Sequence, residues 1–157
     1  MPKQKTIKFR ENITTKLIYE NRDLVFGKLL QKLSLSDLKC VQTESFVDKS
    51  AKSRIRADFE GTLNDGKRFV IEYQLGNANL DHAKAFIYPL IADVDIGIWI
   101  ALDFPDYLKK VVPWFNNGGR AFYLVKATKI HGNGYDAIAD SVKKMDFEVV
   151  ECNGTYS

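Results

Sequence analysis

The spacing of apolar residues predicts a helix near the N-terminus, over about Thr15 to Leu33. Its apolar stripe, at helical spacing, consists of Leu17, Leu24, Val25 and Leu29. Thr14 is placed to cap the N-terminus of this helix. Glu20 lies three residues after Leu17 and four before Leu24, so it falls on or beside the stripe. A carboxylate there is costly to bury unless another group satisfies it.

Shorter apolar runs predict six strands in the rest of the chain. They cover about Lys39 to Val47, Arg54 to Leu63, Lys67 to Leu75, Asp95 to Leu102, Arg120 to Ala127 and Phe147 to Glu151. Further helices are expected over about Asn79 to Ile91, from Pro105 to about Pro113, and over about Tyr135 to Lys144. Hairpins join the early strands and helices join the later ones, which predicts an α/β fold with a mixed sheet flanked by helices.

The segment Asn64-Asp65-Gly66 is a tight hairpin signal between the second and third strands. In a three-residue loop Gly66 supplies the left-handed conformation, and Leu63 then pairs with Lys67. A two-residue loop would shift this register by one position and place Asp58 opposite Tyr73 instead of Glu72.

The three-residue loop places Asp58 opposite Glu72 and Arg56 opposite Gln74, with all four side chains on one face. The other face is ordinary core, made by Ile55, Ala57, Phe59, Ile71 and Tyr73. Opposed carboxylates have Cβ atoms about 5 Å apart and repel each other. A divalent cation would offset this repulsion, because hard cations bind clustered oxygen ligands. The alternative is that both are exposed carboxylates paired with Arg56 or nearby lysines.

Asp58, a hairpin, and then Glu72-Tyr73-Gln74 resemble the motif of the PD-(D/E)XK nuclease superfamily. The α-β-β-β-α-β order from about Thr15 to Leu102 is similar to the restriction-endonuclease-like core of that superfamily. One bacterial branch, mostly of unassigned activity, has Glu-x-Gln-Leu, Asp-His, Tyr, Trp-Ile-Ala and Trp-Leu-Asn in succession. The matching positions here are Glu72 to Leu75, Asp81-His82, Tyr88, Trp99 to Ala101 and Trp114 to Asn116.

The resemblance implies a Mg²⁺ or Mn²⁺ site held by Asp58 and Glu72. It suggests the backbone carbonyl of Tyr73 as a third ligand and Glu20 as a fourth. The alternative for Glu20 is a carboxylate satisfied by the neighbouring Asn21 or Arg22. The cation would polarise the scissile phosphate and lower the pKa of a bound water.

Gln74 stands where the superfamily has a catalytic lysine. Glutamine can hold a water by hydrogen bonding, but it carries no charge and cannot act as a base. Catalysis would then depend more on metal-bound hydroxide, or on Lys84 from the following helix. The alternative for Lys84 is a solvated helix lysine.

Cationic side chains near the hairpin are candidate nucleic-acid contacts. Lys52, Arg54 and Arg56 could touch phosphates, or they could form a solvated edge. His82 matches the Asp-His pattern, which suggests a proton shuttle or phosphate contact. It could equally be a helix N-terminal residue with a local hydrogen bond.

The length of 157 residues fits one domain, with a common core over about 15–102 and α/β additions over 103–157. A net charge of +3 permits an anionic partner without demanding one. Cys40 and Cys152 are expected to be reduced thiols, with one disulfide as the alternative. The absence of a leader sequence and of a span-length apolar run predicts a cytoplasmic protein.

These observations favour a metal-dependent endonuclease that hydrolyses phosphodiester bonds of DNA, with RNA as the other substrate class. The alternative is a catalytically weak or inactive nuclease-fold protein that binds nucleic acid or a protein partner. A third hypothesis is a metal-free interaction domain. Nucleases of this size often need two active sites for two strands, so the resemblance also suggests a homodimer.

Overall fold

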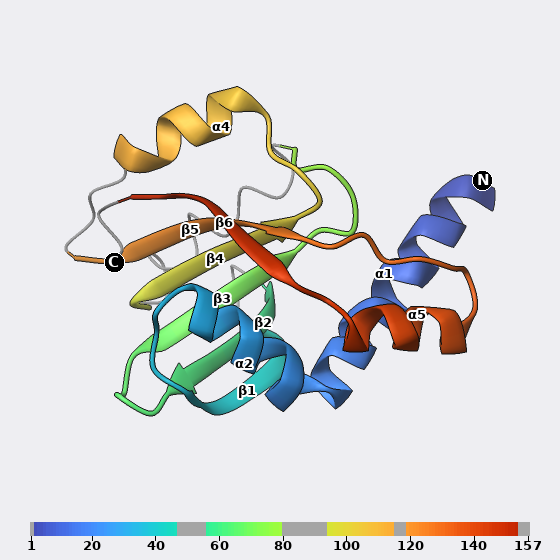
Figure 1. The fold of residues 1–157 in the computed structure, drawn as a ribbon, viewed down its shortest axis with the longest axis horizontal. Helices are drawn as coiled ribbons and strands as arrows, with labels where there is room; N and C mark the ends of the chain where they lie inside the picture. Colours follow the sequence, from blue (N-terminus) through green and yellow to red (C-terminus); the bar gives the residue numbers. More distant parts are fainter. Residues whose placement is uncertain (1, 47–55, 80–93, 115–118, 154–157) are drawn as a thin grey trace.

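The computed structural model describes residues 2–46, 56–79, 94–114 and 119–153. They form an α/β fold around a six-stranded mixed sheet with helices on both faces (Figure 1). The strands are β1 (Leu38–Phe46), β2 (Arg56–Leu63), β3 (Arg68–Tyr73), β4 (Ile96–Ala101), β5 (Ala121–Ala127) and β6 (Phe147–Cys152). The helices are α1 (Pro2–Glu20), α2 (Arg22–Lys32), α4 (Asp106–Val111) and α5 (Tyr135–Lys143), with a 3₁₀ turn, η2, over Val112–Trp114.

The sheet follows chain order, β1-β2-β3-β4-β5-β6. Strands β3, β4 and β5 run parallel to one another, whereas β1, β2 and β6 join by antiparallel pairing. All six predicted strands are present, and the ends that fall on described residues lie within two residues of the predicted ends. The predicted mixed sheet flanked by helices is therefore confirmed.

The prediction for the N-terminal helix was wrong at its start and in its continuity. Helix α1 begins at Pro2, and Thr14 is buried inside it rather than capping it. Thr14 Oγ1 donates a hydrogen bond to the carbonyl of Arg10 at 2.6 Å, which lets threonine sit in a helix interior. The helix breaks at Asn21, whose Nδ2 donates to the Leu17 carbonyl at 2.9 Å. Because α2 restarts at Arg22, Leu24 leaves the stripe and is 46% exposed.

The two faces of the sheet bury separate apolar clusters. One face packs against α1, α2 and α5, and its cluster includes Ile18, Phe26, Phe59, Ile71 and Ile138. The opposite face packs against α4 and η2 around Trp99, Phe104, Leu108, Phe122 and Leu124. Figure 1 shows α4 on one side of the sheet and the other helices across it. Burial of aromatic and aliphatic side chains on both faces is the main stabilising contribution to such a sheet.

Three further predictions concern a helix, the cysteines and membrane-spanning segments. The helix predicted over about Asn79 to Ile91 lies almost wholly outside the described residues. Cys40 and Cys152 are free thiols, as expected. Within the described part of the chain, no helix has the length and apolar character needed to cross a membrane.

Candidate functional site

The β2–β3 hairpin has the loop that its sequence predicts. Gly66 has φ +89°, and its amide donates to the Leu63 carbonyl at 2.9 Å. The Leu63 amide in turn donates to the Lys67 carbonyl at 2.9 Å. Pairing then runs from Thr62 opposite Arg68 to Phe59 opposite Ile71, so the three-residue register is confirmed.

The backbone pairing of β2 and β3 ends one position before the acidic pair. Continuing the register by one position places Asp58 beside Glu72. Here the amide of Tyr73 donates to a side chain of β2 and not to a backbone carbonyl. Asp58 Oδ2 accepts the amide hydrogen of Tyr73 at 2.8 Å. Asp58 is half-buried and Glu72 is buried, at 6% exposure. The carboxylate of Asp58 is therefore fixed to the end of β3 by a charge-assisted hydrogen bond.

The remaining hairpin side chains divide between the two faces as predicted where they are described. Ala57, Phe59, Ile71 and Tyr73 are all buried, and the last three belong to the cluster under α1, α2 and α5. Glu72 lies in register with Trp99 of β4, so it belongs to the α4 side. The observed β2–β3 pairing ends before the predicted pair of Arg56 with Gln74. The side chain of Arg56 is not among those that the structure describes.

Gln74 is buried, and structural hydrogen bonds engage both ends of its amide. Its Nε2 donates to the Asn77 carbonyl at 2.8 Å, and its Oε1 accepts from Trp99 Nε1 at 3.4 Å. A glutamine amide has two N–H donors and two acceptor lone pairs. These two bonds hold its orientation and leave one donor and one lone pair for a further ligand.

The acidic residue of α1 that faces Asp58 is Glu11, which sequence reasoning missed. Burial, and then the charge of Asp58, raise the pKa of the Glu11 carboxyl above its ordinary value. Burial, and then the charge of Glu11, also raise the pKa of the Tyr73 phenol, while Arg10 opposes this shift. Glu11 and Asp58 both line a pocket of about 290 Å³ between α1 and the outer strands β1 and β2. Carboxylates from α1 and β2 thus share one solvent-accessible space.

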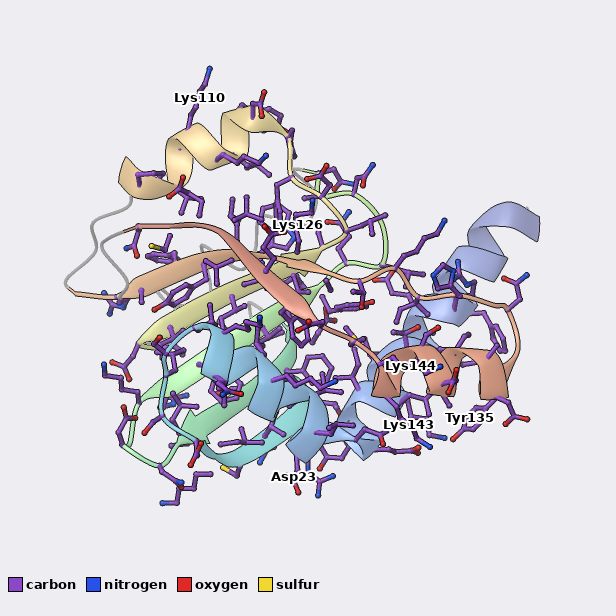
Figure 2. The ribbon with its side chains drawn as sticks, in the orientation of Figure 1. Asp23, Lys110, Lys126, Tyr135, Lys143 and Lys144 are labelled. Atoms are coloured by element: carbon purple, nitrogen blue, oxygen red, sulfur yellow. The ribbon has the colours of Figure 1, made fainter. Side chains whose placement is uncertain are left out.

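Glu20, predicted as a metal ligand, is not brought to this pocket. It lies nine residues after Glu11, which is about two and a half helical turns and about 13.5 Å along the helix, on the opposite face. Glu20 is exposed, and its Oε2 accepts from the hydroxyl of Tyr135 at 3.3 Å. Tyr135 lies on α5, on the side of the molecule away from α4 (Figure 2).

The position of Glu11 could have been found by extending the helix backward. It lies three residues before Thr14 and seven before Ile18, both of which are buried, so it shares their face. The predicted helix began at Thr15 and therefore excluded Glu11.

Arg10 anchors this part of α1 to the segment before α5. Its Nε donates to the Gly132 carbonyl at 3.1 Å, and its Nη2 donates to the Ile130 carbonyl at 2.8 Å.

Four other predicted site residues lie outside the described residues, namely Lys52, Arg54, His82 and Lys84. Tyr73, the suggested carbonyl ligand, is the last residue of β3, with a buried side chain.

The described residues include no group of three His, Cys, Asp or Glu side chains arranged to hold a metal ion. These residues do bring Glu11 together with Asp58, whereas Glu72 lies on the face that packs against α4. No protein-family model, no curated protein and no solved structure matches this chain.

Proposed function

We propose that this chain is a metal-dependent endonuclease of the PD-(D/E)XK type, with a restriction-endonuclease-like core, that hydrolyses phosphodiester bonds of DNA. The observation that supports the proposal most directly is the position of Asp58. It lies where the β2–β3 ladder ends, beside Glu72 in register, and it faces Glu11 of α1. Carboxylates from α1 and β2 therefore share one pocket, and Glu72 lies at the next position of the hairpin register.

The donor chemistry of this region suits Mg²⁺ or Mn²⁺. The raised pKa of Glu11 shows that its negative charge is disfavoured by burial and by Asp58, and a bound cation would reverse that penalty. Asp58 and Glu72 would be the ligands, with Glu11 taking the place that the sequence had suggested for Glu20. When bound, the cation would supply Lewis-acid polarisation of a phosphate and a more acidic water.

The protein groups around the carboxylates have separate roles in this proposal. The amide of Tyr73 occupies Oδ2 of Asp58, which orients the carboxylate and leaves Oδ1 for a ligand. The remaining N–H and lone pair of Gln74 would hold a water. Because glutamine cannot accept a proton at neutral pH, the base must be another group, for which Lys84 stays the proposed alternative.

The bonds of Gln74 also favour a second candidate function. Its amide is committed to Asn77 and Trp99, as expected of a residue that supports the fold. The chain would then be a catalytically weak or inactive nuclease-fold protein that binds nucleic acid or a protein partner. Tight DNA binding without cleavage in any divalent metal would support this function.

Nicking of a supercoiled plasmid in Mg²⁺ or Mn²⁺ tests the endonuclease proposal. We expect cleavage by the wild type and at least a 100-fold loss in Asp58→Asn and Glu72→Gln, because each variant removes an anionic ligand. Glu60→Gln is the matched control. Glu60 lies two residues after Asp58 on the same strand, but its carboxylate pairs with Arg68 at 2.9 Å.

Circular dichroism should show that all three variants keep the wild-type fold. Cleavage by Glu72→Gln at the wild-type rate would contradict the proposal. A wild type that neither binds these cations in calorimetry nor cleaves DNA would contradict it as well.

A further inference from the structure

The pocket beside Asp58 contains more than carboxylates. Its volume is about 290 Å³, and the residues that line it include Tyr19 of α1. Its polar lining residues also include Asn12, Thr15, Lys16 and Thr43, and the Thr15 hydroxyl donates to the backbone carbonyls of Glu11 and Asn12. One wall therefore comes from a single face of α1 and the other from β1 and β2.

This lining matches the chemistry of a nucleobase. An aromatic ring provides a stacking surface for any base. Amide and hydroxyl groups both donate and accept hydrogen bonds, as the polar edge of a base requires. The volume is close to the lower end of small-ligand sites, roughly 300 Å³, so it suits one base and its sugar and is too small for a duplex.

The ring of Tyr19 is held in place before any ligand arrives. The guanidinium of Arg22 lies 4.7 Å from the ring centroid, and Arg22 Nη1 donates to the carbonyl of Tyr19 at 3.1 Å. A cation on an aromatic ring is a stabilising contact. Because the ring is already ordered, stacking on it requires little further loss of side-chain entropy.

From these features we infer that the pocket binds one unpaired nucleobase, next to the phosphate proposed to lie at Asp58. The substrate class of the proposed nuclease is then single-stranded nucleic acid or a frayed end, because a base in an intact duplex must leave its stack to enter. The inference rests on the proposed function for the phosphate at Asp58. The proposed stacking of a base on Tyr19 does not depend on the nuclease activity.

Binding of a fluorescein-labelled 12-nucleotide single strand and of the same sequence as a blunt duplex tests the inference. Fluorescence anisotropy is measured in Ca²⁺ and, separately, in EDTA. We expect the single strand to bind at least tenfold more tightly than the duplex. Tyr19→Ala should weaken single-strand binding about 5- to 150-fold, the effect of losing one stacked base, whereas Tyr19→Phe should bind like the wild type.

Two further variants test whether single-strand binding depends on this pocket or on exposed side chains in general. Asn12→Ala changes an exposed side chain of the pocket and should weaken single-strand binding several-fold. Tyr107→Ala removes a 48% exposed tyrosine from α4, on the other side of the sheet, and should leave it unchanged. Thermal melting checks that each variant is folded.

Equal affinity for single strand and duplex, wild-type binding by folded Tyr19→Ala, or no single-strand binding would overturn the inference. Failure of the nuclease proposal gives a different result. If the protein never nicks plasmid but binds single strands through Tyr19, the base-binding inference holds and the nuclease proposal fails. If it nicks plasmid and Tyr19→Ala does not weaken single-strand binding, the nuclease proposal holds and the base-binding inference fails.

Discussion

Glu11 is held in a place that suits a neutral side chain better than a charged one. Burial and the charge of Asp58 both raise the pKa of its carboxyl. A group whose pKa is raised on folding binds its proton more tightly in the folded state, so the folded state loses stability as the pH rises through that pKa. The cost of Glu11 to stability is therefore absent below about pH 4.5 and fully present above the raised pKa.

Replacement of Glu11 by glutamine should stabilise the metal-free protein at neutral pH. The amide keeps the shape of the side chain and removes the charge, so we expect a melting temperature a few degrees higher at pH 7. The difference should disappear as the pH falls below 4.5. Thermal melts in EDTA between pH 4 and pH 8 measure this, and Glu20→Gln, on the opposite face of α1, is the control. A variant that is less stable than the wild type at pH 8 would contradict the assignment.

Gly61 lies on β2, where the neighbouring strands leave no room for a side chain. A Cβ at this position would clash with the carbonyl of Cys40 and would lie 2.6 Å from the ring of Phe69. Gly61→Ala should therefore cost about 1–3 kcal/mol of unfolding free energy, measured by urea titration. Gly76→Ala is the matched control, because its Cβ would meet nothing within 4 Å, and it should change stability by about 0.5 kcal/mol or less. Equal midpoints for the two variants would contradict this role of Gly61.

At the scale of elements, turn chemistry was a better guide than helix periodicity. The register of β2 and β3 followed from Gly66, because a three-residue hairpin loop needs one left-handed residue and fixes all later pairs. The start of α1 was missed because Thr14 looks like a cap in sequence, while in the fold its hydroxyl bonds back to Arg10. The β2–β3 register could thus be predicted, whereas the position of Glu11 depended on a helix boundary that local sequence does not determine.

Helix α1 depends on Arg10 for its attachment to the distant segment that precedes α5. Arg10→Ala removes two hydrogen bonds from a charged donor to the carbonyls of Ile130 and Gly132. We expect a loss of about 1.5–3 kcal/mol in unfolding free energy and faster hydrogen exchange of α1 amides. Arg10→Lys should be intermediate, because lysine keeps the charge but not the planar set of donors. Unchanged α1 exchange, measured by mass spectrometry, would contradict this role.

At the scale of the molecule, the sequence predicted the sheet better than the way the helices cover it. Short apolar runs and turn residues indicate strands locally, and all six were found. Helix α1 packs by contacts such as Arg10 with Ile130, which join residues 120 positions apart. No local pattern encodes such a contact, so the sequence alone does not predict that Glu11 faces Asp58.

The correspondence between strand order and chain order has a consequence for how the protein is made on the ribosome. Each strand can pair with the one synthesised just before it, so the sheet can grow from its first edge while translation continues. The carbonyls of Ile130 and Gly132 emerge only after β5, and until then the N-terminal helix lacks its anchoring partners. Until those residues have been synthesised, a nascent chain therefore lacks the contacts that hold the part of α1 that carries Glu11.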